Sequence, residues 1–113
     1  MSLQLVWSNG DESSDNGLLL LISGHRKAVT ALAKVGRQIL IAKDEDQAEL
    51  GVQYDAKQAE EESLRSKLAK MPVASVDEAK LKAAHFRRVM QSEWCEVSNR
   101  EIALVLRTIE RMS

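Results

Sequence analysis

The sequence predicts an all-α fold: a single-domain helical bundle of three to four helices, with two long antiparallel helices, a long or broken C-terminal helix and an N-terminal arm. Apolar residues recur at spacings of three and four along most of the chain, which is the period of an amphipathic helix. Proline occurs once, and aromatic residues make up only 4% of the composition. A core of Leu, Val, Ile, Ala and Met suits packed helices, and 113 residues suit one domain.

Residues 1–14 are expected to form an arm and a loop, because a short apolar segment is followed by a polar stretch dense in turn-forming residues. A second interpretation pairs residues 3–7 with residues 18–22 as a β-hairpin, since apolar and polar residues alternate in the first segment. Two strands alone are marginally stable in water, so we favour the packed arm.

The first helix is predicted over residues 15–42. Positions 18, 21, 25, 28, 32, 35, 39 and 42 form one helical stripe, which is apolar except at His25. Glycines weaken this helix, each by about 1 kcal/mol relative to alanine. A break at Ser23 is therefore the main alternative, with the helix then starting near His25.

The second helix is predicted over residues 45–70. Asp44 and Gln47 have the spacing of a capping box at its start. Pro72 ends it, because the residue before a proline is disfavoured in the helical region and proline has no N–H to donate. Glu61 and its charged neighbours interrupt the apolar stripe of this helix, so we expect its middle to be solvated.

Two further helices are predicted over residues 76–96 and 99–112. Each follows a serine, Ser75 or Ser98, that has a glutamate three residues later, which is the pattern of a capping box. The apolar stripe shifts register between the two segments, and this shift favours a boundary. The alternative is one continuous helix over residues 76–112 with a local kink.

The composition excludes several classes of protein. The 16 basic and 17 acidic residues give a net charge of −1, whereas a protein that binds phosphate backbones without sequence preference usually has a clear positive excess. The single cysteine cannot form an internal disulfide. The longest apolar run, residues 18–22, is far shorter than the roughly 20 residues that span a bilayer. We expect a cytoplasmic protein with no membrane partner.

No pattern of catalytic or metal-binding residues stands out. The two histidines and Cys95 lack the spacing of metal ligands, and no phosphate-binding loop or nucleophile elbow is present. Cys95 lies ten residues after His85 on the same predicted helix, about 15 Å away, so the two cannot form a nucleophile and base pair. We expect His25 in the core or at its edge, and His85 pointing outward with Lys82 and Arg88. The sequence therefore predicts no enzyme, cofactor or metal.

With no chemistry indicated, the best prediction is a small regulatory or adaptor protein that acts by binding another protein or a second copy of itself through amphipathic helices. Charge is segmented: residues 23–43 hold five basic and no acidic residues, while residues 44–62 hold eight acidic and one basic. This pattern favours complementary packing between antiparallel neighbours or between subunits. The candidate contact residues are Tyr54, Leu64, Leu68, Trp94 and Leu106.

The alternative prediction is a DNA-binding regulator in which the helices at 76–96 and 99–112 form a helix-turn-helix. Residues 98–103 resemble the opening of the first helix in helix-turn-helix domains of the LuxR type. That resemblance covers six residues, and we expect no recognition helix after it. In this alternative the residues at the front of the reading helix and those facing phosphates are Asn99, Arg100, Arg107 and Arg111.

Overall fold

The computed structural model describes residues 12–111, with side chains from residue 17, and over that range its only regular secondary structure is helical. The four helices are α1 (Glu12–Ile41), α2 (Asp44–Lys70), α3 (Val76–Met90) and α4 (Asn99–Glu110). The predicted all-α bundle is confirmed. Residues 18–22 belong to α1, so they form no β-hairpin strand, and residues 3–7 lie outside the described part of the chain.

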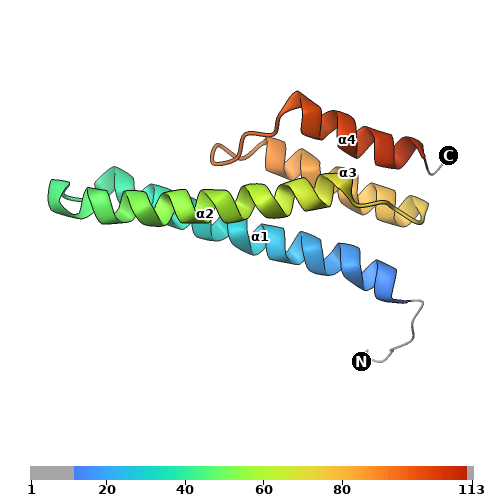
Figure 1. The fold of residues 1–113 in the computed structure, drawn as a ribbon, viewed down its shortest axis with the longest axis horizontal. Helices are drawn as coiled ribbons and strands as arrows, with labels where there is room; N and C mark the ends of the chain where they lie inside the picture. The colour runs from blue at the N-terminus through green and yellow to red at the C-terminus, as the bar shows by residue number, and fades with distance from the viewer. Residues whose placement is uncertain (1–11, 112–113) are drawn as a thin grey trace.

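The long helices α1 and α2 form an antiparallel hairpin along the 51 Å longest dimension of the molecule (Figure 1). The shorter helices α3 and α4 lie against one end of this hairpin and run in opposite directions. We call the end covered by α3 and α4 the base. The other end, where α1 turns into α2, projects beyond the base as a two-helix hairpin.

Helix α1 is continuous through Ser23 and Gly24, so the alternative break does not occur. Leu18, Ile22 and Leu32 are 1%, 7% and 0% exposed. The apolar face that they share packs into the base, and this burial outweighs the weak helix propensity of glycine. The apolar cluster around Leu18 and Ile22 also includes Leu68 and Ala69 of α2, Phe86 of α3 and Val105 of α4.

The serine caps explain where the two short helices begin. The Ser98 hydroxyl accepts from the Glu101 N–H at 3.1 Å while the Glu101 carboxylate accepts from the Ser98 N–H at 3.0 Å, a complete capping box. The Ser75 hydroxyl likewise accepts from the Glu78 N–H. The Glu78 carboxylate accepts from the Ala74 N–H instead of closing the box on Ser75. Both predicted helix starts are confirmed.

The predicted end of the third helix at residue 96 is wrong, because α3 ends at Met90 and residues 91–98 are not helical. The N–H of Gln91 donates to the Arg88 carbonyl, and the N–H of Ser92 donates to the Val89 carbonyl. These bonds span three residues and tighten the last turn of the helix. The alternative of one continuous helix over residues 76–112 is therefore also wrong.

The predicted capping box of Asp44 and Gln47 does not form. The cap residue of α2 is Lys43, which makes no side-chain cap hydrogen bond. The Gln47 side-chain amide donates instead to the carbonyls of Ile39 and Ala42, at 3.2 and 3.3 Å. Gln47 thus satisfies carbonyls left free at the end of α1.

Burial divides the hairpin into two halves. Within the described chain, buried residues of α1 extend to Val35 and Gly36, and those of α2 begin at Glu61. No residue between 37 and 60 is buried. We call residues 37–60 the distal hairpin. No helix in the described range is long and apolar enough to cross a membrane.

Candidate functional site

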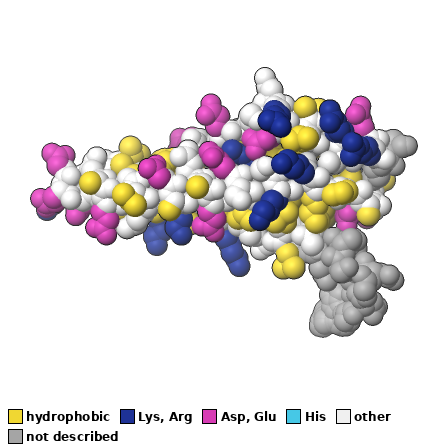
Figure 2. Space-filling view, in the orientation of Figure 1, with side chains coloured by type: hydrophobic (Ala, Val, Ile, Leu, Met, Phe, Trp, Pro, Cys, Tyr) yellow, Lys and Arg dark blue, Asp and Glu magenta, His cyan; other side chains and the backbone are white. Residues whose placement is uncertain are grey.

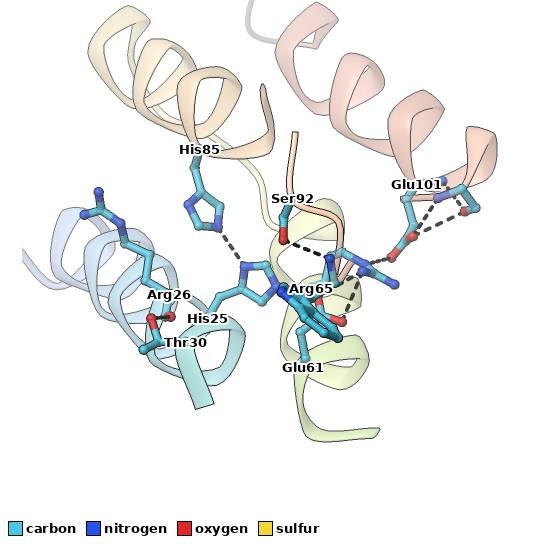
Figure 3. A network of polar contacts seen from close by, with 10 residues as sticks. His25, Arg26, Thr30, Glu61, Arg65, His85, Ser92 and Glu101 are labelled. Carbon is cyan, nitrogen blue, oxygen red and sulfur yellow. Dashed lines mark hydrogen bonds and ion pairs between the residues drawn. The ribbon is translucent and has the colours of Figure 1, made fainter. Parts of the chain in front are cut away.

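Five polar side chains form a continuous hydrogen-bonded chain inside the base and connect all four helices (Figure 3). His25 Nδ1 lies 2.8 Å from His85 Nε2, and His25 Nε2 lies 2.8 Å from the Glu61 carboxylate. Arg65 donates to both Glu61 oxygens, at 2.9 and 3.1 Å, and its Nε donates to Glu101 at 3.0 Å. We call His85, His25, Glu61, Arg65 and Glu101 the buried polar chain.

The helical period places these groups in the interior. His25 lies seven residues after Leu18 and seven before Leu32, so it shares their buried face and is 0% exposed. Glu61 lies seven residues before the fully buried Leu68 and is itself 1% exposed. The expectation that the middle of α2 is solvated is therefore wrong at Glu61, although both neighbouring glutamates are exposed.

The ion pairs at one end of the buried polar chain stabilise its charges. Burial opposes the charge of Arg65, but the hydrogen bond to Glu101 and the charges of Glu61 and Glu101 outweigh it and raise the pKa of the guanidinium. Burial alone would raise the pKa of Glu101, but its hydrogen bonds from Ser98 and Arg65 lower it. Arg65 is thus a permanent cation between two carboxylates.

His85, at the other end, stays neutral. Burial lowers its pKa to about 4, with further contributions from His25, Arg26 and Arg88. Its ring is 2% exposed, and its Nδ1 has no hydrogen-bond partner within the described part of the chain. The expectation that His85 points outward is wrong, whereas His25 lies in the core as expected.

Lys82 is a second buried polar group, although we expected it on a solvated face. It is 0% exposed, and its ammonium donates to the carbonyls of Ala69 and Met71 and to the Thr108 hydroxyl, at 3.1, 2.6 and 2.8 Å. Burial lowers its pKa to about 8. Lys82 therefore joins the last turn of α2 to α3 and α4, and its charge complements the negative end of the α2 dipole.

Cys95 lies half-buried beside the buried polar chain. Together with Tyr54, Gln58 and Trp94 it lines a surface cavity that reaches Glu61. Burial and the negative charge of Glu61 raise the pKa of the thiol to about 11. Because the thiolate is the nucleophilic form, Cys95 is held in its unreactive state.

The predicted contact residues fall into three environments. Leu68 is 0% exposed in the core, so it lies on no surface of this fold. Tyr54 and Trp94 are half-buried and pack edge to face with ring centroids 6.4 Å apart, while Leu64 is also half-buried. Leu106 is 56% exposed and lines an apolar groove between α3 and α4.

The residues of the DNA-binding alternative are all exposed on or beside α4. Their arrangement differs from a helix-turn-helix, which joins its two helices at 90–120° through a turn of three or four residues. Here α3 and α4 run in opposite directions and are joined by the longer segment 91–98. The exposed residues of the DNA-binding alternative are Asn99, Arg100, Arg107 and Arg111.

A search of family models, curated protein sequences and solved structures found no match for this chain. Within the described residues, no group of three or more His, Cys, Asp or Glu side chains is arranged to hold a metal ion. Function must therefore be inferred from the surfaces and the buried polar groups of the chain itself.

Proposed function

We propose that this chain is a small regulatory or adaptor protein that acts through protein–protein contact, and that its distal hairpin pairs with the distal hairpin of a second copy. The observation that carries the proposal is the exposure of large apolar side chains in a segment with no core of its own. Leu40, Ile41 and Val52 are 75%, 86% and 70% exposed. No residue of the distal hairpin is buried.

A hairpin of this kind has little to stabilise it in isolation. Most helix stability in proteins comes from packing an apolar face, and a short helix without such packing is marginal in water. Full burial of a large aliphatic side chain contributes roughly 1.5–3 kcal/mol, so covering three of them on each copy is a substantial driving force. A groove at the tip, lined in part by Ile41 and Leu50, offers a seat for such side chains.

Charge favours a second copy as the occupant. Exposed Lys27 and Lys34 lie on α1, and exposed Asp46 and Glu49 lie at the start of α2. Within the described residues, none of these four forms an ion pair. Figure 2 shows the acidic side chains gathered at the tip of the hairpin and basic ones nearer the base. Two antiparallel hairpins related by a two-fold axis would place each acidic tip beside the basic stretch of its partner.

Sedimentation velocity of the full chain tests the pairing. We expect a dimer at about 50 µM, a concentration at which even a modest free energy of association populates it. The double variant I41E/V52E should be monomeric and still helical by circular dichroism. The matched control is L106E, which places the same charge on the exposed groove between α3 and α4 and should remain dimeric.

The results for these variants distinguish the distal hairpin from α4 as the surface through which two copies pair. A wild-type monomer at that concentration would overturn the pairing, and a monomeric L106E beside a dimeric I41E/V52E would move the contact to α4. Specific charge pairing is tested by K27E/K34E, which should weaken the dimer, and by addition of D46K/E49K, which should restore it. Binding to duplex DNA that falls steeply with salt and depends on Arg100 would replace the proposal with the DNA-binding alternative.

A further inference from the structure

An apolar groove lies between α3 and α4 on the surface of the base. Its volume is about 170 Å³, below the roughly 300–1,000 Å³ of pockets that hold drug-sized ligands. Phe86 and Val105 line its inner side and are 4% and 6% exposed. Met90 of α3 and Leu106 of α4 also line it and are 54% and 56% exposed. Single exposed apolar side chains are common on proteins, but two that line the same groove mark a candidate contact surface.

The lining has the spacing of a helix-packing face on both helices. On α3 it consists of Ala83 and the residues three, four and seven positions later, and on α4 of Ile102 and the residues three, four and seven positions later. Residues at these spacings share one side of a helix and can contact a neighbouring helix together. Each helix thus presents a stripe of two turns, apolar except at Arg87, that its neighbours in the base cover only in part. The surface that fits such a groove is the apolar face of a third helix.

The charges on α3 and α4 favour an acidic occupant. Among the described residues, Arg87 is the only charged side chain that lines the groove, and exposed Lys80 lies seven residues before it on the same side of α3. The two helices expose two acidic residues, Asp77 and Glu110, against five basic ones. Within the described part of the chain, none of these seven forms an ion pair. The five basic residues are Lys80, Arg87, Arg88, Arg100 and Arg107.

The proposed dimer leaves this groove free for a different protein. Figure 2 shows Lys and Arg side chains gathered over the base, with hydrophobic side chains among them, and acidic side chains at the tip of the hairpin. In the dimer each acidic tip lies beside the distal hairpin and the basic stretch of α1 of the other copy. The acidic segment of a second copy is therefore already in use and is not available to the groove.

We propose that the groove between α3 and α4 is where this adaptor binds its partner, and that the partner presents an amphipathic α-helix whose large aliphatic side chains are flanked by acidic residues. The aliphatic side chains pack between Met90 and Leu106, and a carboxylate beside them accepts from Arg87. The inference rests on the proposed adaptor function, but it does not depend on the dimer, because the groove lies outside the distal hairpin.

A displayed library of random peptides about 16 residues long tests the groove without assuming a sequence, since a helix of that length spans about 24 Å. The full chain is the target, and peptides that also bind L106E are discarded. We expect the remaining peptides to carry large aliphatic residues three and four positions apart, with Asp and Glu in excess of Lys and Arg. A selection that retains no peptide, or that retains peptides without this spacing or without the acidic excess, would overturn the proposal.

Fluorescence anisotropy of the strongest selected peptide tests the apolar contacts. L106E and M90E, which alter different helices, should each weaken binding at least about tenfold, because each places a charge where an apolar side chain is covered. Circular dichroism checks that each variant is folded, and either one is sufficient if the other is not. Unchanged affinity in a folded M90E would exclude the groove as the binding site.

R87E separates a specific charge contact from general attraction. It should weaken binding about three- to tenfold at low ionic strength, and a peptide whose acidic residues are replaced by lysine should prefer R87E to the wild type. The matched control is R88E, which alters an exposed arginine that lines the pocket between α1 and α3 instead. Equal losses in R87E and R88E would show non-specific attraction and contradict the proposed contact.

Sedimentation velocity of the same variants keeps this inference distinct from the dimer. If both are correct, L106E is a dimer that does not bind the peptide, and I41E/V52E is a monomer that binds it as the wild type does. A wild-type monomer that binds the peptide would overturn the dimer alone. A monomeric L106E would show that a second copy occupies the groove, and would overturn the acidic partner helix.

Discussion

The base and the distal hairpin are built from the same two long helices, yet they are held together in different ways. In the base, α1 and α2 bury Leu18, Ile22 and Leu68 against α3 and α4. In the distal hairpin the same helices bury no residue and expose Leu40, Ile41 and Val52. The comparison teaches that a long helix can pass from a self-sufficient core to a segment whose stability depends on what covers it.

The base also differs in its use of charge. Its buried polar chain fixes the rotation of all four helices at once, because each group is placed by a partner on another helix or one turn away. The charges of the distal hairpin that flank its apolar side chains form no ion pair within the described residues. The charges of the buried polar chain are therefore paired inside the base, whereas the charges of the distal hairpin can pair with those of another molecule.

The largest expected effect comes from breaking the buried polar chain. Glu61→Leu removes the acceptor shared by His25 and Arg65 and leaves Arg65 with Glu101 alone; removing one partner of a buried ion pair costs about 3–5 kcal/mol of unfolding free energy. The control is Glu60→Leu at an exposed neighbouring position, which should change stability by less than about 0.5 kcal/mol. Urea unfolding monitored by circular dichroism measures both. A loss of less than about 1 kcal/mol of unfolding free energy in E61L would mean that the buried polar chain contributes little to the stability of the base.

Lowering the pH should destabilise the end of the bundle that α3 and α4 cover, because His85 lies in it. Its pKa is about 4 in the fold and 6.5 ordinarily, so the unfolded chain binds more protons between these values. Stability from this group is complete above about pH 6.5 and is lost as the pH falls towards about 4, by up to about 3 kcal/mol. Unfolding midpoints measured across this range should show the loss, and H85Q should reduce it. An unchanged slope in H85Q would assign the acid sensitivity to other groups.

Gly36, at the boundary of the base, and Gly51, in the distal hairpin, differ in the space available for a side chain. The Trp94 indole lies against Gly36 so closely that a β-carbon would clash with it, whereas nothing lies within 4 Å of a β-carbon at Gly51. Gly36→Ala should destabilise the fold by about 1–3 kcal/mol through overpacking and displace Trp94. Gly51→Ala should stabilise it by up to about 1 kcal/mol through helix propensity. Thermal unfolding compares them, and a stabilising G36A would contradict the packing of Trp94 at this position.

Local sequence signals predicted the helices well and their partners poorly. Ser98 marks the start of α4 because a capping box is complete within four residues, and Pro72 similarly limits α2. The end of α3 at Met90 was missed because it depends on hydrogen bonds in the segment after it. The side-chain hydrogen bonds of Gln47 were mispredicted because its acceptors, the carbonyls of Ile39 and Ala42, lie at the end of the preceding helix rather than in its own.

The buried polar chain was missed because its partners are 36 and 60 residues apart, and sequence spacing does not define which faces of two helices meet. A usable signal was present. Glu61 and Arg65 are four residues apart, so they can pair on one face of α2, and Glu61 occupies a position in the apolar stripe of that helix, which Lys57 also interrupts. Lys82 was similarly expected on the surface because of its charge, although it lies at helical spacing between the buried residues Ala79 and Phe86.

Hydrogen exchange as a function of protein concentration tests the central claim, that the distal hairpin is completed by a second copy while the base is complete by itself. We expect amides in residues 37–60 to exchange quickly in dilute protein and to become protected as concentration rises, with base amides such as that of Leu68 protected throughout. Protection in residues 37–60 that does not change with concentration, while matching the base, would contradict the account.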